Sequence, residues 1–333
     1  MRFRAAFILI SLTLVLHGQV PGASLSANRK EDPFIKYIRS ISSQSTRDNI
    51  GFFEKIFNII VGFEPVLYNN PVNLFASGNS NCWIINQGDG SILHYKDGKT
   101  ERIAAFKKSS TPFTSLVGIA PIGTSGILFT DSRLNKVYLL AEDEKQIKTF
   151  SDTCTILRPT GIAYSEKNNE VWVVETGSHC VSVFDRNGKK IKTIGRRGNG
   201  PLEFNFPTYI WIDKDGKIYI VDSMNFRVEI LSSEGEFISA FGKQGDATGS
   251  FARPRGIATD SQGNIYVVDA LFNAVQIFDI SGRLLYYFGS QGNGDYQFWL
   301  PSGIYIDKSD FIYIADSYNA RVQVYQFVKN DQK

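Results

Sequence analysis

The sequence predicts an all-β chain made of six repeated four-stranded antiparallel sheets arranged in a ring. Three observations predict this fold: a unit that recurs about every 47 residues, four short apolar runs in each unit, and glycine-containing turns between the runs. The composition agrees, because 25 Phe and 15 Tyr residues favour strands and 29 Gly residues supply turns. A chain of 333 residues, 43% of them hydrophobic, is long enough to build a large core.

The repeat is clearest in the last three units, which begin at Pro207, Pro254 and Pro301 with the letters PTYIWID, PRGIATD and PSGIYID. A weaker copy begins at Pro159. Each unit has one position at which an acid closes its second strand, and similar spacing finds this position in two earlier units. The six positions are Asn86, Asp131, Glu175, Asp222, Asp269 and Asp316.

The apolar runs of the fourth unit show how each sheet is built. They span Tyr209–Asp213, Lys217–Val221, Val228–Ser232 and Phe237–Phe241, with Gly216 and Gly235 in the first and third turns. The second run is apolar on both alternating faces, so its sheet must pack between two others. Six such sheets around a common axis form a six-bladed β-propeller.

The units resemble a known family. The pattern Pro-x-Gly-Ile-Ala-x-Asp, then Gly-x-Ile-Tyr-Val-x-Asp-x-x-Asn-x-Arg-Val and Phe-Gly-x-x-Gly, is similar to the NHL repeat across residues 159–327 and more weakly across 71–150. The resemblance implies a six-bladed propeller that most often serves as a binding platform. Some six-bladed relatives are instead lyases or lactonases that hold a metal in the central channel.

A polar trio recurs just after the second strand, and we interpret it as structural. An acid is followed by Asn three positions later and by Arg five positions later, in more than one unit. A set of catalytic residues would not be expected to recur in blade after blade, as this trio does. We expect charge-assisted hydrogen bonds that hold the loop between strands two and three. The structural positions are Asp131, Lys136, Asp222, Asn225, Arg227, Asp269, Asp316, Asn319 and Arg321.

The propeller is predicted over residues 64–328, and its last unit supplies only three strands. Residues 33–42 resemble the missing outer strand, so we expect Phe34–Ile41 to pair with the third strand of the last blade and close the ring. The alternative is an unstructured segment. Residues 48–63 have the apolar spacing of a short helix that packs on the propeller or, alternatively, lies on a membrane.

The N-terminus reads as a secretory signal peptide over residues 1–23, followed by a polar linker at 24–32. Arg2 and Arg4 precede an apolar core that is too short to span a bilayer, and small residues follow it. An uncleaved anchor is the alternative. Removal of this segment lowers the net charge from +3 by two units, which gives no support for binding nucleic acid. We expect a periplasmic, cell-surface or extracellular location and no stable membrane span.

The few cysteine and histidine residues limit which disulfides and metal sites the chain can form. Cys154 and Cys180 belong to loops that share one face of the third blade, so we predict that they form a disulfide, with two independent thiols as the alternative. Only three His residues occur, and one lies in the predicted signal peptide, so the remaining His94 and His179, at different blade positions, cannot form a three-histidine metal site. We therefore expect no catalytic residues, no metal and no cofactor, although a calcium held by backbone and carboxylate oxygens needs no sequence signature.

The loops that lead into each first strand share a face with the loops between strands two and three. Aromatic, apolar and arginine side chains on this face fit a protein or peptide interface. We therefore predict a non-enzymatic binding or scaffolding protein, with the metal-dependent lyase or lactonase as its rival. The expected binding residues are Arg133, Arg196, Arg197, Tyr209, Met224, Arg253, Arg255, Leu271, Trp299 and Tyr318.

Overall fold

The computed structural model of the protein describes residues 34–43, 66–78, 80–103, 105–106, 113–151 and 155–328. The predicted signal peptide, polar linker and 48–63 helix lie outside these residues, and so does Cys154. Within the described ranges, no helix is long and apolar enough to cross a membrane.

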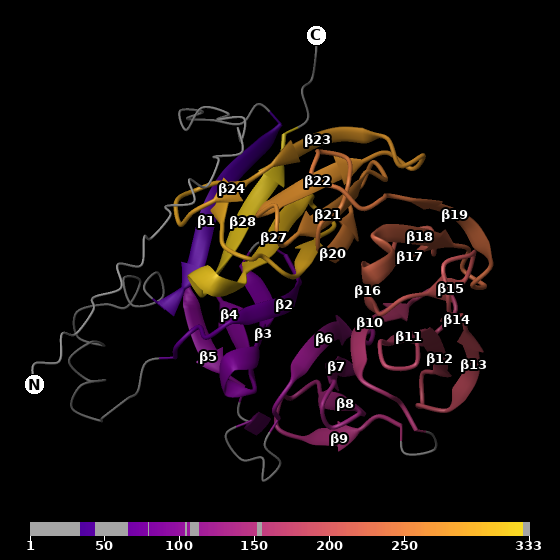
Figure 1. Ribbon diagram of the computed structural model, residues 1–333. Helices are drawn as coiled ribbons and strands as arrows, with labels where there is room; N and C mark the ends of the chain where they lie inside the picture. The colour runs from indigo at the N-terminus through magenta and orange to yellow at the C-terminus, as the bar shows by residue number, and fades with distance from the viewer. Residues whose placement is uncertain are drawn as a thin grey trace, which may run out of the picture. The chain divides into compact units, whose positions relative to one another are not determined.

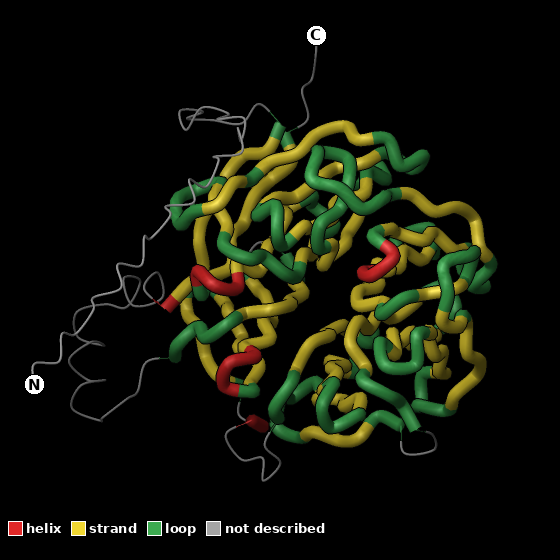
Figure 2. The backbone as a smooth tube through the Cα atoms, viewed as in Figure 1, coloured by secondary structure: helices red, strands yellow, loops and turns green. Residues whose placement is uncertain are grey.

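Six four-stranded antiparallel sheets, blades 1 to 6 in chain order, follow one another around a ring (Figure 1). Strands and loops alternate around the whole ring (Figure 2). Blade 1 consists of β2 (Pro71–Ala76), β3 (Asn81–Asn86), β4 (Ser91–Lys96) and β5 (Lys99–Arg102). Blade 2 consists of β6 (Leu116–Pro121), β7 (Gly126–Asp131), β8 (Lys136–Ala141) and β9 (Ile147–Thr149). Blade 3 consists of β10 (Pro159–Ser165), β11 (Glu170–Glu175), β12 (Cys180–Asp185) and β13 (Lys190–Ile194).

The second half of the ring repeats this order until its last strand. Blade 4 consists of β16 (Pro207–Ile212), β17 (Ile218–Asp222), β18 (Arg227–Leu231) and β19 (Phe237–Phe241). Blade 5 consists of β20 (Pro254–Thr259), β21 (Ile265–Asp269), β22 (Ala274–Phe278) and β23 (Leu284–Phe288). Blade 6 consists of β26 (Ile304–Ile306), β27 (Phe311–Asp316), β28 (Arg321–Phe327) and β1 (Ile35–Ser42).

Blade 6 takes its outer strand from the other end of the chain. β1 pairs antiparallel with β28, as the sequence predicted, and the two lie side by side in Figure 1. A bulge interrupts the pairing between Tyr37 and Arg39. The Tyr296 hydroxyl bridges this bulge, since it donates to the Ile35 carbonyl (3.0 Å) and accepts from the Tyr37 amide (2.8 Å). A tyrosine from the loop before β26 thus fixes the closing strand.

The hydrophobic core lies between the blades. Buried apolar residues form six clusters, and each cluster combines neighbouring blades; in one, Trp172 and Val174 of β11 pack with Ile218 and Ile220 of β17. All five residues of β17 are buried, which explains why its sequence is apolar on both faces. Each fully buried Ile or Val in such a cluster contributes on the order of 1.5–3 kcal/mol.

The inner strands approach one another so closely that four of them carry a glycine. A Cβ on Gly256 would lie 2.6 Å from the Ser302 carbonyl oxygen and 2.7 Å from the Ile304 nitrogen of the next blade. Only glycine fits such backbone-to-backbone contact. Tyr209 occupies the corresponding position of blade 4, and Asn73 that of blade 1.

Candidate functional site

Two sets of loops meet on one face of the ring, which we call the loop face. In blades 2 to 5 the first residue of the inner strand pairs with the acid that ends the second strand, as in Pro207–Asp222 and Pro254–Asp269. The loop leading into the inner strand and the loop between strands two and three therefore start from neighbouring points. The turns between strands one and two lie at the opposite ends of the strands, on what we call the turn face.

In blade 4 the recurring trio binds both loops. Asp222 is buried; its Oδ1 accepts from the Asn205 amide (2.6 Å), and its Oδ2 accepts from Asn225 Nδ2 (2.7 Å) and Arg227 Nε (2.9 Å). A 3-10 turn, η2 (Ser223–Asn225), carries Asn225 to this position. Burial raises the pKa of Asp222 despite these donors. The carboxylate therefore acts as the centre of a hydrogen-bonded loop clamp.

Arg227 extends the clamp to the backbone of the lead-in loop. Its Nη1 donates to the Asn199 carbonyl (2.7 Å), and its Nη2 donates to the carbonyls of Gly200 (2.9 Å) and Glu203 (2.6 Å). Blade 6 repeats these contacts from η3 (Ser317–Asn319), where Asp316, Asn319 and Arg321 bind one another and the carbonyls of residues 292–297. These side chains are saturated by contacts within the chain.

The acids of blades 2, 3 and 5 hold their loops without an arginine. The Asp131 carboxylate accepts four backbone N–H groups, and Lys136 faces it across the β7–β8 pair. Asp269 likewise accepts from the amides of its lead-in loop and of Leu271. Glu175 accepts from the Leu157 amide at 2.9 Å.

Cys180 occupies the arginine position of blade 3. It pairs with Glu175 in the β11–β12 ladder and is a buried free cysteine in the structure. Burial raises its pKa to about 11, which keeps the thiol protonated at neutral pH. Because Cys154 lies outside the described residues, the disulfide between the two stays a prediction and draws no support from the structure.

Hydroxyl side chains one position after the acid link neighbouring blades, a role that the sequence analysis missed. Thr176 donates to the Pro207 carbonyl (2.6 Å), and Ser317 donates to the Pro71 carbonyl (2.7 Å). The signal was present in the sequence, since Ser or Thr follows the acid in four of the six units. Each bond joins the second strand of one blade to the inner strand of the next.

Exposed apolar side chains gather on the loop face of blades 3 to 6. The predicted residues Met224, Leu271, Trp299 and Tyr318 are 48–61% exposed, and the rings of Trp299 and Tyr318 lie 5.8 Å apart. Leu157 and Phe206, which lie two residues and one residue before the inner strands of blades 3 and 4, are also exposed, although the sequence analysis did not single them out. We call these six residues the apolar arc: Leu157, Phe206, Met224, Leu271, Trp299 and Tyr318.

The predicted arginines differ in their surroundings. Arg196 and Arg197 are exposed on the short strand β14 (Arg196–Arg197), and Arg196 binds Glu203 at 2.8 Å. Arg253 is exposed and Arg255 is half-buried. The charge of Arg255 lowers the pKa of Arg253.

Tyr209 is a correction, because it does not lie on the loop face. Its side chain is 5% exposed, and its hydroxyl lies 2.6 Å from Ser302 Oγ of blade 6 and 3.4 Å from the Val72 carbonyl of blade 1. Tyr209 stands where other blades have glycine, so its ring extends across the axis of the ring instead of outward. Tyr209 is therefore one of the residues that line the central cavity.

The central channel forms a cavity of about 480 Å³ lined by all six inner strands and by turns of the turn face, including Asp213–Gly216 and Asp307–Lys308. Tyr305 lies in its wall and has no hydrogen-bond partner within the described residues, and burial raises its pKa to about 12. Neither described histidine lines this cavity: His94 stacks on Trp83, and His179 Nδ1 accepts from the Phe206 amide.

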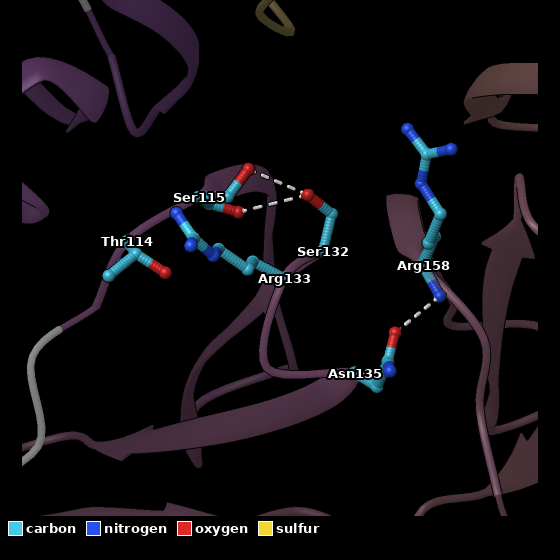
Figure 3. Close-up of a pocket in the computed structure, with 6 residues that line it drawn as sticks. All are labelled: Thr114, Ser115, Ser132, Arg133, Asn135 and Arg158. Atoms are coloured by element: carbon cyan, nitrogen blue, oxygen red, sulfur yellow. Dashed lines mark hydrogen bonds between the residues drawn. The ribbon is translucent and has the colours of Figure 1, made fainter.

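A second cavity, of about 440 Å³, opens on the loop face between blades 2 and 3 (Figure 3). Arg133 leads toward Ser115 and Thr114, whereas Arg158 stands on the opposite side and points away from them. We call this cavity the arginine crevice; its lining residues are Thr114, Ser115, Ser132, Arg133, Asn135 and Arg158. Across the described ranges, no group of three His, Cys, Asp or Glu side chains is placed to hold a metal ion.

Comparisons with known proteins agree with this architecture. A family described as a 6-bladed beta-propeller matches residues 147–228 and 214–275, and the NHL repeat matches residues 298–325. The protein is a six-bladed β-propeller with NHL repeats. No curated protein matches the chain.

Solved structures with the same fold include proteins of different kinds. Virginiamycin B lyase from Staphylococcus aureus is 17% identical to this propeller, with a TM-score of 0.57 over 78% of this chain and 96% of that chain. A nidogen/laminin complex gives 16% identity and a TM-score of 0.60 over 77% and 88%. An auxiliary nutrient binding protein from Bacteroides thetaiotaomicron is 15% identical, with a TM-score of 0.61 over 79% of this chain and 70% of that chain. At these identities the likeness shows the fold alone.

Proposed function

We propose that this propeller is a non-enzymatic binding or scaffolding protein that engages a protein or peptide partner through its loop face. The observation that carries the proposal is the apolar arc. Six of the thirteen large hydrophobic side chains that are exposed in the described residues lie on this one face, on four consecutive blades. Contiguous exposed apolar groups rimmed by arginine are typical of protein interfaces.

The rigidity of the face supports this proposal. The clamps of blades 4 and 6 and the backbone hydrogen bonds of Asp131 and Asp269 hold the loops in place before any partner arrives. Binding to such a preformed face costs little conformational entropy. Aromatic side chains such as Trp299 and Tyr318 contribute large contact areas at interfaces.

The test is affinity capture from the extracellular fraction of the source cells. We expect a partner that the wild-type propeller retains and that a Trp299→Ser/Tyr318→Ser variant loses. Ile191→Ser is the matched control, since Ile191 is 51% exposed but lies on the outer strand β13. If the partner is retained by the double variant and lost by the control, the outer strands and not the loop face form the interface.

The exported location is part of the proposal and rests on residues 1–23. We expect secreted protein to begin after residue 22 or close to it, and mass spectrometry of its N-terminus measures this directly. Full-length chain that stays in the cytoplasm would contradict the export of this propeller.

The rival function is a metal-dependent lyase or lactonase that uses the central channel. The 480 Å³ cavity and the unpartnered Tyr305 hydroxyl favour it, because both offer room and a polar group to a small ligand. A histidine-to-alanine variant of the S. aureus lyase is described as catalytically inactive, and neither His94 nor His179 of this chain faces the cavity. Elemental analysis of protein purified without chelators decides: about one calcium or zinc per chain favours the rival.

A further inference from the structure

The arginine crevice has an unusual balance of hydrogen-bonding groups, because its acceptors are already used. Both oxygens of Asp131, which lies beneath it, accept backbone N–H groups: Oδ1 from Arg133 and Leu134, and Oδ2 from Thr114 and Ser115. Asn135 Oδ1 accepts from the Arg158 amide at 2.7 Å. What remains free to face the cavity is mainly donors.

The donors carry two positive charges. The guanidinium groups of Arg133 and Arg158 are exposed and make no ion pair or hydrogen bond with any described residue. Two other exposed arginines are paired with carboxylates, Arg196 with Glu203 and Arg283 with Asp279. Arg197 and Arg253 resemble the crevice arginines in having no carboxylate partner within the described residues, but neither lines this cavity. The hydroxyls of Ser115 and Ser132 lie 2.7 Å apart between the two crevice arginines (Figure 3).

The position of the crevice connects it to the apolar arc. Arg133 occupies in blade 2 the position that Met224, Leu271 and Tyr318 occupy in blades 4 to 6, and Arg158 stands where blade 4 has Phe206. On the loop face the arginine crevice of blades 2 and 3 therefore lies next to the start of the apolar arc at Leu157. A single extended segment can contact both the crevice and the arc.

We propose that the arginine crevice binds a carboxylate and thereby anchors an acidic residue of the partner peptide whose apolar side chains cover the apolar arc. Guanidinium groups bind carboxylates through paired, charge-assisted hydrogen bonds, and the serine hydroxyls can donate to the same oxygens. This inference rests on the proposed function, which it sharpens by naming the chemistry of the partner. Phosphate would use the same donors, so the test compares the two anions.

The experiment is an NMR titration of the whole propeller with sodium acetate and, separately, inorganic phosphate at constant ionic strength. We expect the side-chain Nε–Hε signals of Arg133 and Arg158 to shift and saturate with acetate. An Arg133→Gln/Arg158→Gln variant, followed through the backbone amides of Ser115 and Ser132, should bind at least about tenfold more weakly. Arg186→Gln is the control, because Arg186 binds Ser125 on the turn face. Its replacement should leave the titration unchanged.

Two results would overturn the assignment. A shift that grows linearly without saturation, or that is equal at Arg186, would show that the crevice is not a site. Phosphate that binds more than tenfold more tightly than acetate would assign the crevice to a phosphorylated group instead. If acetate fails while the Trp299→Ser/Tyr318→Ser variant still loses the partner, the carboxylate proposal fails and the proposed function stands.

Discussion

Blades 4 and 6 carry the same clamp, yet one residue beneath it differs. Asp222, Asn225 and Arg227 have the same mutual contacts as Asp316, Asn319 and Arg321. Two residues beyond each arginine, blade 4 has Glu229 and blade 6 has Gln323, and both are fully buried. The comparison shows the effect of one negative charge beneath the same clamp, although Glu203 and Leu231 of blade 4 are also replaced in blade 6, by Gln297 and Tyr325.

Gln323 and Glu229 have different hydrogen-bond partners. Gln323 Nε2 donates to the Gln297 carbonyl (2.6 Å) and to Asp316 Oδ2 (3.1 Å), and its Oε1 accepts from the Tyr325 hydroxyl (2.9 Å). Glu229 Oε2 accepts from the Leu202 amide (3.1 Å), but its Oε1 lies 2.6 Å from Arg227 Nη2 without hydrogen-bond geometry.

Burial decides the protonation of Glu229. Desolvation raises its pKa to about 7, and the attraction of Arg227 offsets only part of that effect. The neutral amide in blade 6 avoids this cost. The position therefore tolerates a charge but does not need one, and the acid adds a pH dependence that the clamp itself does not require.

The largest effect should come from removing the carboxylate of blade 6. Asp316→Ala leaves Arg321 without any carboxylate, so we expect a loss of about 3–5 kcal/mol in the free energy of unfolding, measured by urea denaturation. Asp222→Ala should cost less at pH 8, because Arg227 keeps Glu229 as a partner. Equal losses would show that Glu229 does not compensate Arg227.

Glu229→Gln should change the pH dependence of stability. A buried acid with a raised pKa is held protonated in the fold after the unfolded chain has released its proton, so its contribution falls as pH rises from 4.5 to about 7. We expect the variant to gain up to about 3 kcal/mol over wild type between pH 4.5 and pH 8. Urea denaturation at both values measures it, and parallel curves would contradict the raised pKa.

The reciprocal change, Gln323→Glu, should create the same dependence in blade 6. A carboxylate there would face the Gln297 carbonyl and Asp316 in place of an amide donor, so we expect a loss of about 1–3 kcal/mol at pH 8 and a smaller loss at pH 5. Gln276→Glu in blade 5 is a control that has no neighbouring clamp arginine, since Ala274 replaces it. A loss independent of pH would point to packing and not to charge.

The smallest effect should come from the asparagines. Asn225→Ala and Asn319→Ala each remove one bond to the acid and one to a lead-in carbonyl, so we expect about 1 kcal/mol from each. Because these contacts are the same in both blades, the two losses should be equal. A clear difference would show that Glu229 also acts through Asn225.

The sequence predicted the parts of the site that are local in the chain. Asp222 ends β17, Asn225 ends the 3-10 turn that follows and Arg227 begins β18, so their contact can be predicted from spacing alone. The carbonyls of Gly198 and Asn199 that complete the clamp come from another loop, and a backbone carbonyl leaves no mark in the sequence. The order of the blades and the positions of their strands were predictable because the sequence unit repeats.

The prediction from the repeat was wrong for Tyr209. The sequence predicts this position, just inside the inner strand, to be part of the loop face. In the structure the Tyr209 side chain instead reaches across the ring to Ser302 and Val72, which the repeat pattern does not reveal. Of the two arginines that line the arginine crevice, the sequence predicted Arg133 as a binding residue but not Arg158. Arg158 occupies the same position in the repeat as Arg253, which the sequence did predict as a binding residue.

The pairing of β1 with β28 sets an order on how the chain is completed. Ile41 of β1 is paired with Val322 of β28, so β1 cannot pair until β28, about 280 residues later in the chain, has been synthesised. During synthesis from the N-terminus, blades 1 to 5 can each form from consecutive strands, whereas blade 6 cannot be finished until nearly the whole chain is available. Closing so long a loop carries an entropy cost that the consecutive strands of blades 1 to 5 do not share. Until β1 pairs with it, β28 presents an open sheet edge, which is prone to wrong pairing.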